Sequence, residues 1–295
     1  MPWFCPRCGR EYSDKIEYCP RCGFERLYRL RGYPEPKPKI KIEYSSESHW
    51  LANPWFLNPK LEQKFPSEGV YTNKRVELAP LNGDWKWGLR GYTWNGGLNP
   101  ILNCAFDAYK AGEDDYNVKL WGQDDSGRWG VITLIQGWVW GGNPPADWYR
   151  PAPLPVSNKK NMKLDAWIWQ QGGPFPWWHF YYFARNCLFD VWMKDSSGKI
   201  LMMDLYFVGG GANWYDENSY HYAKTIATAP SQTWYEVSVT LDSIIDDAIQ
   251  AAKDDANMDF DKNTLKIYQV EILAEVKYAW CDLIVGAFTF TYEEA

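Results

Sequence analysis

The sequence predicts a mostly β protein: a two-sheet antiparallel β-sandwich of the jelly-roll type with one amphipathic helix, preceded by a small N-terminal metal module. Three observations support this fold class. From residue 45 onward, short β-rich runs alternate with turn sequences such as NGG at 95–97 and GGG at 209–211. One segment only, residues 240–257, has the spacing of an amphipathic helix. The N-terminus carries the same cysteine unit twice.

The N-terminal module is defined by Cys5-Pro-Arg-Cys8-Gly and Cys19-Pro-Arg-Cys22-Gly, with ten residues between the pairs. Each Cys-x-x-Cys turn places two thiolates on one side of a tight loop, and two such turns supply the tetrahedral site that structural zinc prefers. Two redox pairs or two disulfides are the alternatives. The motif resembles the zinc-ribbon family. We therefore expect residues 1–32 to fold around a closed, structural Zn²⁺.

A Pro-rich linker follows the module. Proline alternates with charged residues in PEPKPK at 34–39, which favours an extended chain. We place the linker at residues 33–44 and the β-sandwich at residues 45–295. The start of the sequence, MPWFCPRCG, lacks the basic and apolar stretches of a secretory signal, so we expect a cytoplasmic protein.

Composition excludes two classes of function. No run of about 18 apolar residues is present, so the sequence predicts no transmembrane segment. The formal net charge is −6, which argues against nucleic acid as a partner, because phosphate contacts need a basic surface. The chain is nevertheless 18% aromatic, with 19 Trp and 20 Tyr. Such a content of flat rings needs a structural or functional reason.

The helix predicted over residues 240–257 has one apolar stripe and an acidic outer face. Thr240 can cap its N-terminus, and Asp242 in the first turn suits the helix dipole. Four aspartates lie at or beyond its C-terminal end: Asp254, Asp255, Asp259 and Asp261. They either form a polar helix exit or ligate Ca²⁺. Their spacing is not the regular spacing of a known calcium-binding loop.

Two smaller features concern the strands. The segments Trp121–Arg128 and Trp192–Lys199 share the pattern W-x-x-D-x-S-G-R/K, which predicts two equivalent hairpins. Three further cysteines occur singly, at Cys104, Cys187 and Cys281. Isolated cysteines in β-rich sequence are expected to be small buried apolar residues.

Strand alternation separates an aliphatic face from a face of rings and polar groups. In YQVEILAEV at 268–276, Val270 and Ile272 oppose Gln269 and Glu271, and other strands repeat this arrangement. A surface of tryptophans, amides and carboxylates suits carbohydrate, because sugar rings stack on indole and their hydroxyls need paired donors and acceptors. A protein interface is the alternative. The candidate substrate-binding residues are Gln136, Trp138, Trp140, Trp167, Trp169, Trp192, Tyr206 and Gln269.

The C-terminal part resembles concanavalin-like jelly rolls, and within them the family-12 glycoside hydrolases and related carbohydrate-binding jelly rolls. The segments that carry the resemblance are FDVWMKDSSGKILMMDLYF, TWYEVSVTLDSIIDDAI and LKIYQVEILAEVKYAWCDLIVGAFTF. The family uses one Glu as nucleophile and one Glu as acid/base. The resemblance places the acid/base at Glu275, with Glu271 as second choice. Asp204 is the only carboxylate on the strand that matches the nucleophile strand, and it departs from the Glu of the family.

A retaining mechanism would require Glu275 to stay protonated through a raised pKa while Asp204 stays ionised and attacks. The sequence thus predicts a family-12-like β-glycan hydrolase acting on a β-glycan or oligosaccharide. A non-catalytic carbohydrate-binding module is the first alternative. The second is a structural protein whose aromatic face makes subunit contacts in a homo-oligomer or larger assembly.

Overall fold

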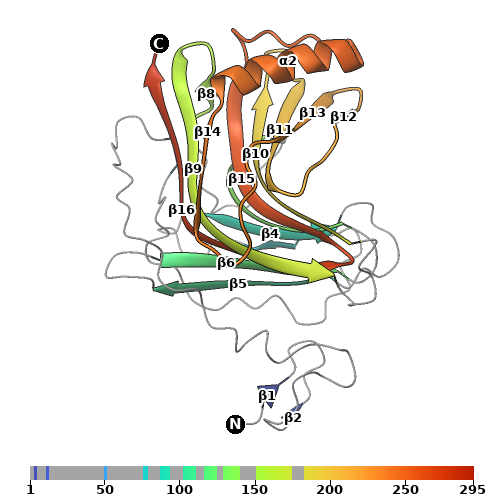
Figure 1. Ribbon diagram of the computed structural model, residues 1–295. Coiled ribbons are helices and arrows are strands. Elements are labelled where there is room, and N and C mark those ends of the chain that lie inside the picture. Colours follow the sequence, from blue (N-terminus) through green and yellow to red (C-terminus); the bar gives the residue numbers. More distant parts are fainter. Residues whose placement is uncertain are drawn as a thin grey trace.

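A computed structural model of the chain describes residues 3–4, 11–12, 50–51, 76–78, 87–93, 102–110, 116–124, 129–139, 151–174 and 183–295. The described part is a sandwich of two β-sheets with one helix, as the sequence predicts (Figure 1). No helix in these ranges is long and apolar enough to cross a membrane.

The first sheet has nine strands. In spatial order its strands are β12 (Trp214–Tyr215), β13 (Ser219–Thr225), β11 (Ile200–Val208), β10 (Ala184–Lys194), β15 (Lys266–Lys277), β7 (Gly130–Gly137), β4 (Gly88–Thr93) and β3 (Val76–Leu78). The short strand β8 (Leu154–Pro155) also pairs with β15. One pair, β11 with β13, is parallel, which the expectation of an antiparallel sandwich did not include.

The second sheet has five strands. They are β14 (Tyr235–Thr240), β9 (Lys159–Pro174), β16 (Ala279–Glu294), β6 (Tyr116–Asp124) and β5 (Leu102–Lys110), in that order. β9 and β16 each run for 16 residues and bend together along the sandwich (Figure 1). The register between them shifts between Val285 and Ala287, and an irregularity of this kind increases local bend and twist.

The core lies between the sheets and follows the predicted alternation. Ala166 and Ile168 of β9 face Phe189 and Val191 of β10 across it, and all four are fully buried. Aromatic side chains connect the layers: Phe189 stacks on Phe288 with ring centroids 5.2 Å apart. The aliphatic faces inferred from the sequence are therefore the faces that form the inter-sheet core.

The segments Trp121–Arg128 and Trp192–Lys199 are not equivalent hairpins. β10 and β11 do form a hairpin, and Asp195 closes its turn by accepting hydrogen bonds from the backbone of Ser197 and Lys199. β6 and β7, by contrast, belong to different sheets. A shared turn sequence specifies a change of chain direction, but the packing of the following strand decides which sheet it joins.

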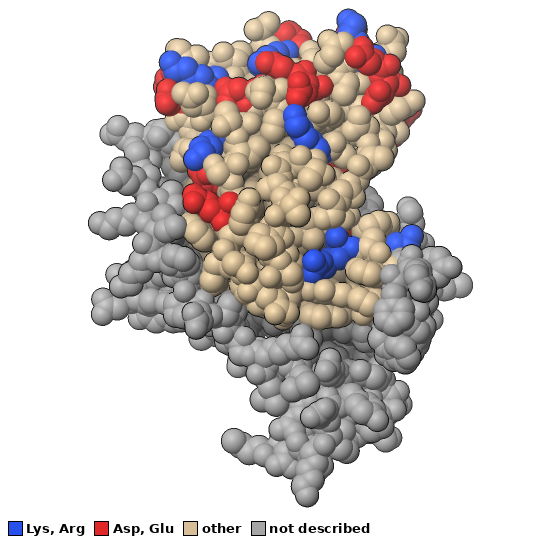
Figure 2. Space-filling view, in the orientation of Figure 1, with Lys and Arg blue, Asp and Glu red and all other residues tan. Residues whose placement is uncertain are grey.

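The predicted helix is present as α2 (Asp242–Ala256), and its apolar stripe packs on the core through Ile244, Ile245 and Ala248. Its start differs from the expectation, because Thr240 is the last residue of β14 and no side chain caps the helix. The carboxylate of Asp242 instead accepts a hydrogen bond from the backbone N–H of Met162, which ties α2 to β9. Charged side chains gather at the end of the molecule where α2 lies (Figure 2).

Candidate active site

Three carboxylates lie side by side on the outer face of the nine-stranded sheet, the face turned away from the inter-sheet core. Asp204 of β11 pairs directly with Asp190 of β10, and Asp190 pairs directly with Glu271 of β15. Directly paired residues of antiparallel strands share a face, with Cβ atoms about 5 Å apart. All three are buried. We call Asp204, Asp190 and Glu271 the carboxylate row.

Asp190 is the member of this row that the list of candidate residues missed. Alternation along β10 already places Asp190 on the same face as Trp192. What the sequence does not contain is the register between β10 and its two neighbours. That register brings Asp190 between the other two carboxylates.

The carboxylate of Glu271 is held on the side of the row nearest β7. Its Oε2 accepts a hydrogen bond from the Thr133 hydroxyl at 2.7 Å, and its Oε1 accepts one from the side-chain amide of Gln269. The Oε1 atom of Gln269 in turn accepts the backbone N–H of Val139 at 3.2 Å. These bonds turn the Glu271 side chain away from Asp204, which lies on the far side of β10.

Glu275 lies on the same face, four residues further along β15, and it is half-buried. Asn186 of β10 pairs with Glu275 and donates its Nδ2–H to the carboxylate at 3.1 Å. Glu275 therefore leans toward β10 and, beyond it, toward Asp204. The Oδ1 atom of Asn186 accepts the backbone N–H of Gly210 at 3.3 Å. Gly209 is required beside it, because its φ is +77° and a Cβ there would lie 2.0 Å from Asn186 Oδ1.

The surroundings of Asp204 favour its protonated form. Burial, followed by the charges of Glu275 and Glu271, raises the pKa of Asp204 well above its ordinary value. Its Oδ1 atom is buried and accepts no hydrogen bond among the residues that the structure describes. Burial and the negative charges of Asp204, Glu275 and Asp190 also raise the pKa of Tyr206. A raised pKa favours the protonated form of Asp204, whereas the sequence-based expectation required Asp204 to be ionised.

A row of three aromatic side chains and one methionine runs beside the carboxylate row on the same face. Trp192 of β10 pairs with Met202 of β11, Met202 pairs with His221 of β13, and His221 pairs with Trp214 of β12. We call Trp192, Met202, His221 and Trp214 the aromatic row. Gln269 continues it on β15, paired with Trp192. Alternation predicted the side on which Trp192 lies but gave no indication that His221 and Trp214 join it.

The remaining predicted binding residues lie elsewhere. Trp167 and Trp169 belong to β9 and therefore to the other sheet, so the single surface expected from the sequence does not exist. Gln136 pairs with Val270, whose side chain faces the core, and it lies on the opposite side of the sheet from Gln269. Trp138 is half-buried just beyond the end of β7, and Trp140 is outside the described residues.

The four cysteines predicted to bind zinc lie outside the described residues; they are Cys5, Cys8, Cys19 and Cys22. The strands β1 (Trp3–Phe4) and β2 (Glu11–Tyr12) pair antiparallel and flank the first cysteine pair in the sequence. A hairpin at this place is what the first Cys-x-x-Cys turn of a zinc ribbon requires.

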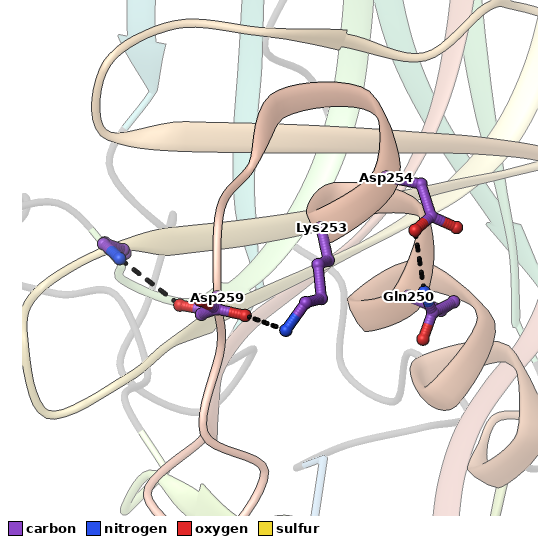
Figure 3. Close-up of polar contacts among 5 residues, drawn as sticks. Gln250, Lys253, Asp254 and Asp259 are labelled. Atoms are coloured by element: carbon purple, nitrogen blue, oxygen red, sulfur yellow. Dashed lines mark hydrogen bonds and ion pairs between the residues drawn. The ribbon is translucent and has the colours of Figure 1, made fainter.

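The aspartates proposed as calcium ligands make separate polar contacts. Asp254 accepts a hydrogen bond from Gln250, and Asp259 forms an ion pair with Lys253 at 2.9 Å (Figure 3). Asp255 accepts bonds from Tyr220 and Asn213, away from the other two. Within the described ranges, no group of three or more His, Cys, Asp or Glu residues is placed to hold a metal ion. The arrangement is that of a polar helix exit, and calcium has no support from it.

Comparisons with known proteins give two findings. Residues 4–26 match the family model described as a zinc-ribbon domain, which confirms the N-terminal prediction. No curated protein matches the chain.

Solved structures similar to the chain include the family-12 hydrolases that the sequence resembles. The chain is 11% identical to a family 12 xyloglucanase from Bacillus licheniformis, covering 75% of this chain and 98% of that one with a TM-score of 0.45. For endoglucanase cel12A from Rhodothermus marinus the identity is 13%, the coverages 71% and 93%, and the TM-score 0.43. For a family 11 carbohydrate-binding module from Clostridium thermocellum the identity is 12%, the coverages are 75% of this chain and 95% of that chain, and the TM-score is 0.34.

Proposed function

We propose that this protein binds a β-glycan on the outer face of its nine-stranded sheet and hydrolyses it with Asp204 and Glu275. The observation that carries the proposal is Asp204 itself. It is a buried carboxyl group with a raised pKa and an Oδ1 atom that accepts no hydrogen bond within the described part of the chain. Buried polar atoms are nearly always paired, and buried acids with raised pKa values are typical of active sites.

The proposed chemistry gives the proton to Asp204 and the attack to Glu275. Asp204 donates its proton to the glycosidic oxygen as that bond to the anomeric carbon breaks. Glu275, ionised and leaning toward β10, attacks the anomeric carbon and forms a covalent glycosyl-enzyme ester. The Asp204 carboxylate then removes a proton from water, which attacks the same carbon and releases Glu275. The product keeps the configuration of the substrate.

The remaining groups on this face suit sugar recognition. Trp192 supplies an indole ring, Gln269 an amide and Tyr206 a hydroxyl, and all three are buried on the same side of the sheet as Asp204. Small-molecule sites are usually lined by aromatic and apolar side chains together with a few hydrogen-bonding groups. Glu275 is half-buried, so this face meets solvent at the Glu275 side chain.

The test is reducing-end release from soluble β-glucans by wild type, Glu275→Gln, Asp204→Asn and a control, Glu236→Gln. Glu236 is an exposed strand glutamate on the other sheet, paired with Trp167. We expect release by wild type and the control, and a loss of about a hundredfold or more in the two site variants. Loss with Glu271→Gln and not with Glu275→Gln would assign the second role to Glu271. No release by wild type would refute the hydrolase.

A non-catalytic carbohydrate-binding protein is the second candidate. The burial of the carboxylate row favours this candidate, because Asp190 and Glu271 are only 3% and 1% exposed. In addition, both carboxylate oxygens of Glu271 accept hydrogen bonds, from Thr133 and Gln269. Retention of the protein on a β-glucan gel without release of reducing ends would support this candidate.

A further inference from the structure

The search for a site beyond the carboxylates leads to the edge of the nine-stranded sheet. Trp214 of the edge strand β12 is 43% exposed, although it is a large aromatic residue. Its ring lies almost flat on the imidazole of His221, with centroids 3.4 Å apart and an angle of 24° between the planes. One face of the indole is therefore covered, and the solvent-exposed part includes the opposite face.

His221 gives this ring a fixed and uncharged support. It is 3% exposed and meets the edge of Trp192 with an angle of 81°. Its Nδ1 atom is buried and makes no hydrogen bond within the described ranges. Burial lowers the pKa of His221 to about 3, so the imidazole is neutral at physiological pH. The exposed indole ring of Trp214, supported by an uncharged imidazole, therefore presents a flat apolar surface.

The surroundings of Trp214 define the ligand. The aromatic row carries no charge at neutral pH, and the carboxylate row lies two residues further along the strands, about 7 Å away. Carboxylates at this distance disfavour an anionic ligand such as a nucleic acid. A neutral β-linked hexose has an apolar C–H face that matches the indole and hydroxyl groups at its rim.

A protein partner fits this surface less well. Among the described side chains, only Phe183, Trp214 and Tyr215 are large, apolar and exposed. Trp214 and Tyr215 are consecutive residues of a strand, so they point to opposite faces of the sheet. A stable protein interface needs about 800 Å² on each partner, which two separated rings do not supply.

We propose that Trp214, supported by His221, is a stacking platform for one sugar residue of a neutral β-linked glycan chain. This inference rests on the proposed function, because it takes the same sheet face as the place where the chain binds. The platform also sets a minimum length for the glycan that can use it. The platform on β12 lies two strands across the sheet and two residues along the strands from Asp204 on β11, about 12 Å in all, so a short ligand bound at Asp204 does not reach it.

The experiment compares Trp214→Ala with Tyr215→Ala as a matched control. Tyr215 is the next residue of β12, is 55% exposed and stacks on Tyr220 on the other face. Calorimetric titration with cellohexaose and with cellobiose, in the Glu275→Gln background to prevent hydrolysis, measures the two Kd values. We expect Trp214→Ala to weaken cellohexaose binding about tenfold and to leave cellobiose unchanged, whereas Tyr215→Ala changes neither. Trp214→Phe, which keeps a ring, should retain most of the affinity.

The outcomes separate the platform from the proposed function. If Glu275→Gln binds cellohexaose and both alanine variants bind it equally well, the platform is refuted and the carbohydrate site stands. A loss with both alanine variants to the same extent also refutes it, since the effect would then belong to the strand and not to the ring. If the parent protein with Glu275→Gln and the wild type bind neither sugar, the platform and the proposed function both fail.

Discussion

Cys187 and Cys281 face each other across the interior of the sandwich, with their Sγ atoms 3.6 Å apart although 94 residues separate them in the sequence. Cys187 belongs to β10 of the nine-stranded sheet and Cys281 to β16 of the five-stranded sheet. Both are fully buried free thiols, as expected for isolated cysteines, but no pattern along the chain indicated that they meet.

These two thiols should be unreactive in the folded protein. The hydrogen bond with Cys187 and burial raise the pKa of Cys281, and only the thiolate reacts with alkylating reagents. Iodoacetamide treatment followed by peptide mass spectrometry should find both cysteines unmodified in native protein and modified in denaturant. Labelling of either residue under native conditions, at the rate seen in denaturant, would contradict their burial.

Asp204→Asn should stabilise the fold at neutral pH. Because the pKa of Asp204 is raised in the folded state, the unfolded chain loses this proton first as pH rises, and the free energy of unfolding falls between the ordinary Asp pKa and the raised one. The amide removes this cost, and each pKa unit corresponds to about 1.4 kcal/mol. Urea unfolding at pH 4 and pH 7.5 should show a gain that is larger at pH 7.5. A loss of stability at both pH values would indicate that the proton is absent.

His221→Phe should make the fold more resistant to acid. The pKa of His221 is lowered to about 3, so the unfolded chain takes up this proton first as pH falls below 6.5. Wild type therefore loses about 1.4 kcal/mol per pH unit between these two values, and the variant does not. The difference in unfolding free energy between the variant and wild type should shift by about 2 to 3 kcal/mol in favour of the variant between pH 7.5 and pH 4.5. An unchanged difference would contradict the buried neutral imidazole.

Zinc should be bound by the N-terminal module and nowhere else among the cysteines. We expect one Zn²⁺ per chain by elemental analysis, and loss of the metal in Cys19→Ser, because a structural site needs all four ligands. Cys104→Ser is the matched control, since Cys104 lies in β5 of the sandwich. Full zinc content in Cys19→Ser would show that the predicted ligand set is not the site.

The fold class was predictable because it depends on local patterns. Alternation along β10 and β15 assigned Val191 and Ile272 to the core correctly, and the 3.6-residue period located α2. Alternation reports only which side of its own sheet a residue takes. Trp167 and Trp192 both satisfy the pattern of an outward ring, yet they belong to different sheets on opposite sides of the core.

The site was only partly predictable, because register is a long-range property. Asp204, Glu271 and Glu275 were identified from residue type and from the resemblance to family 12. The raised pKa of Asp204 was not predictable, since it depends on burial and then on charges contributed by β15. No pattern in the sequence indicated where His221 lies. The parallel pairing of β13 with β11 places His221 beside Met202, and no turn sequence predicts that pairing.

The crowding of carboxylates around Asp204 couples ligand binding to the hydrogen-ion concentration. Glu275 and Glu271 both act on the affinity of Asp204 for its proton, so a ligand that covers this face and excludes water changes that affinity again. Protons must then be exchanged with the buffer in proportion to the amount of ligand bound. The apparent enthalpy of glycan binding should therefore depend on the ionisation heat of the buffer, and the number of protons exchanged per glycan would report the change in protonation of Asp204 together with the carboxylates coupled to it.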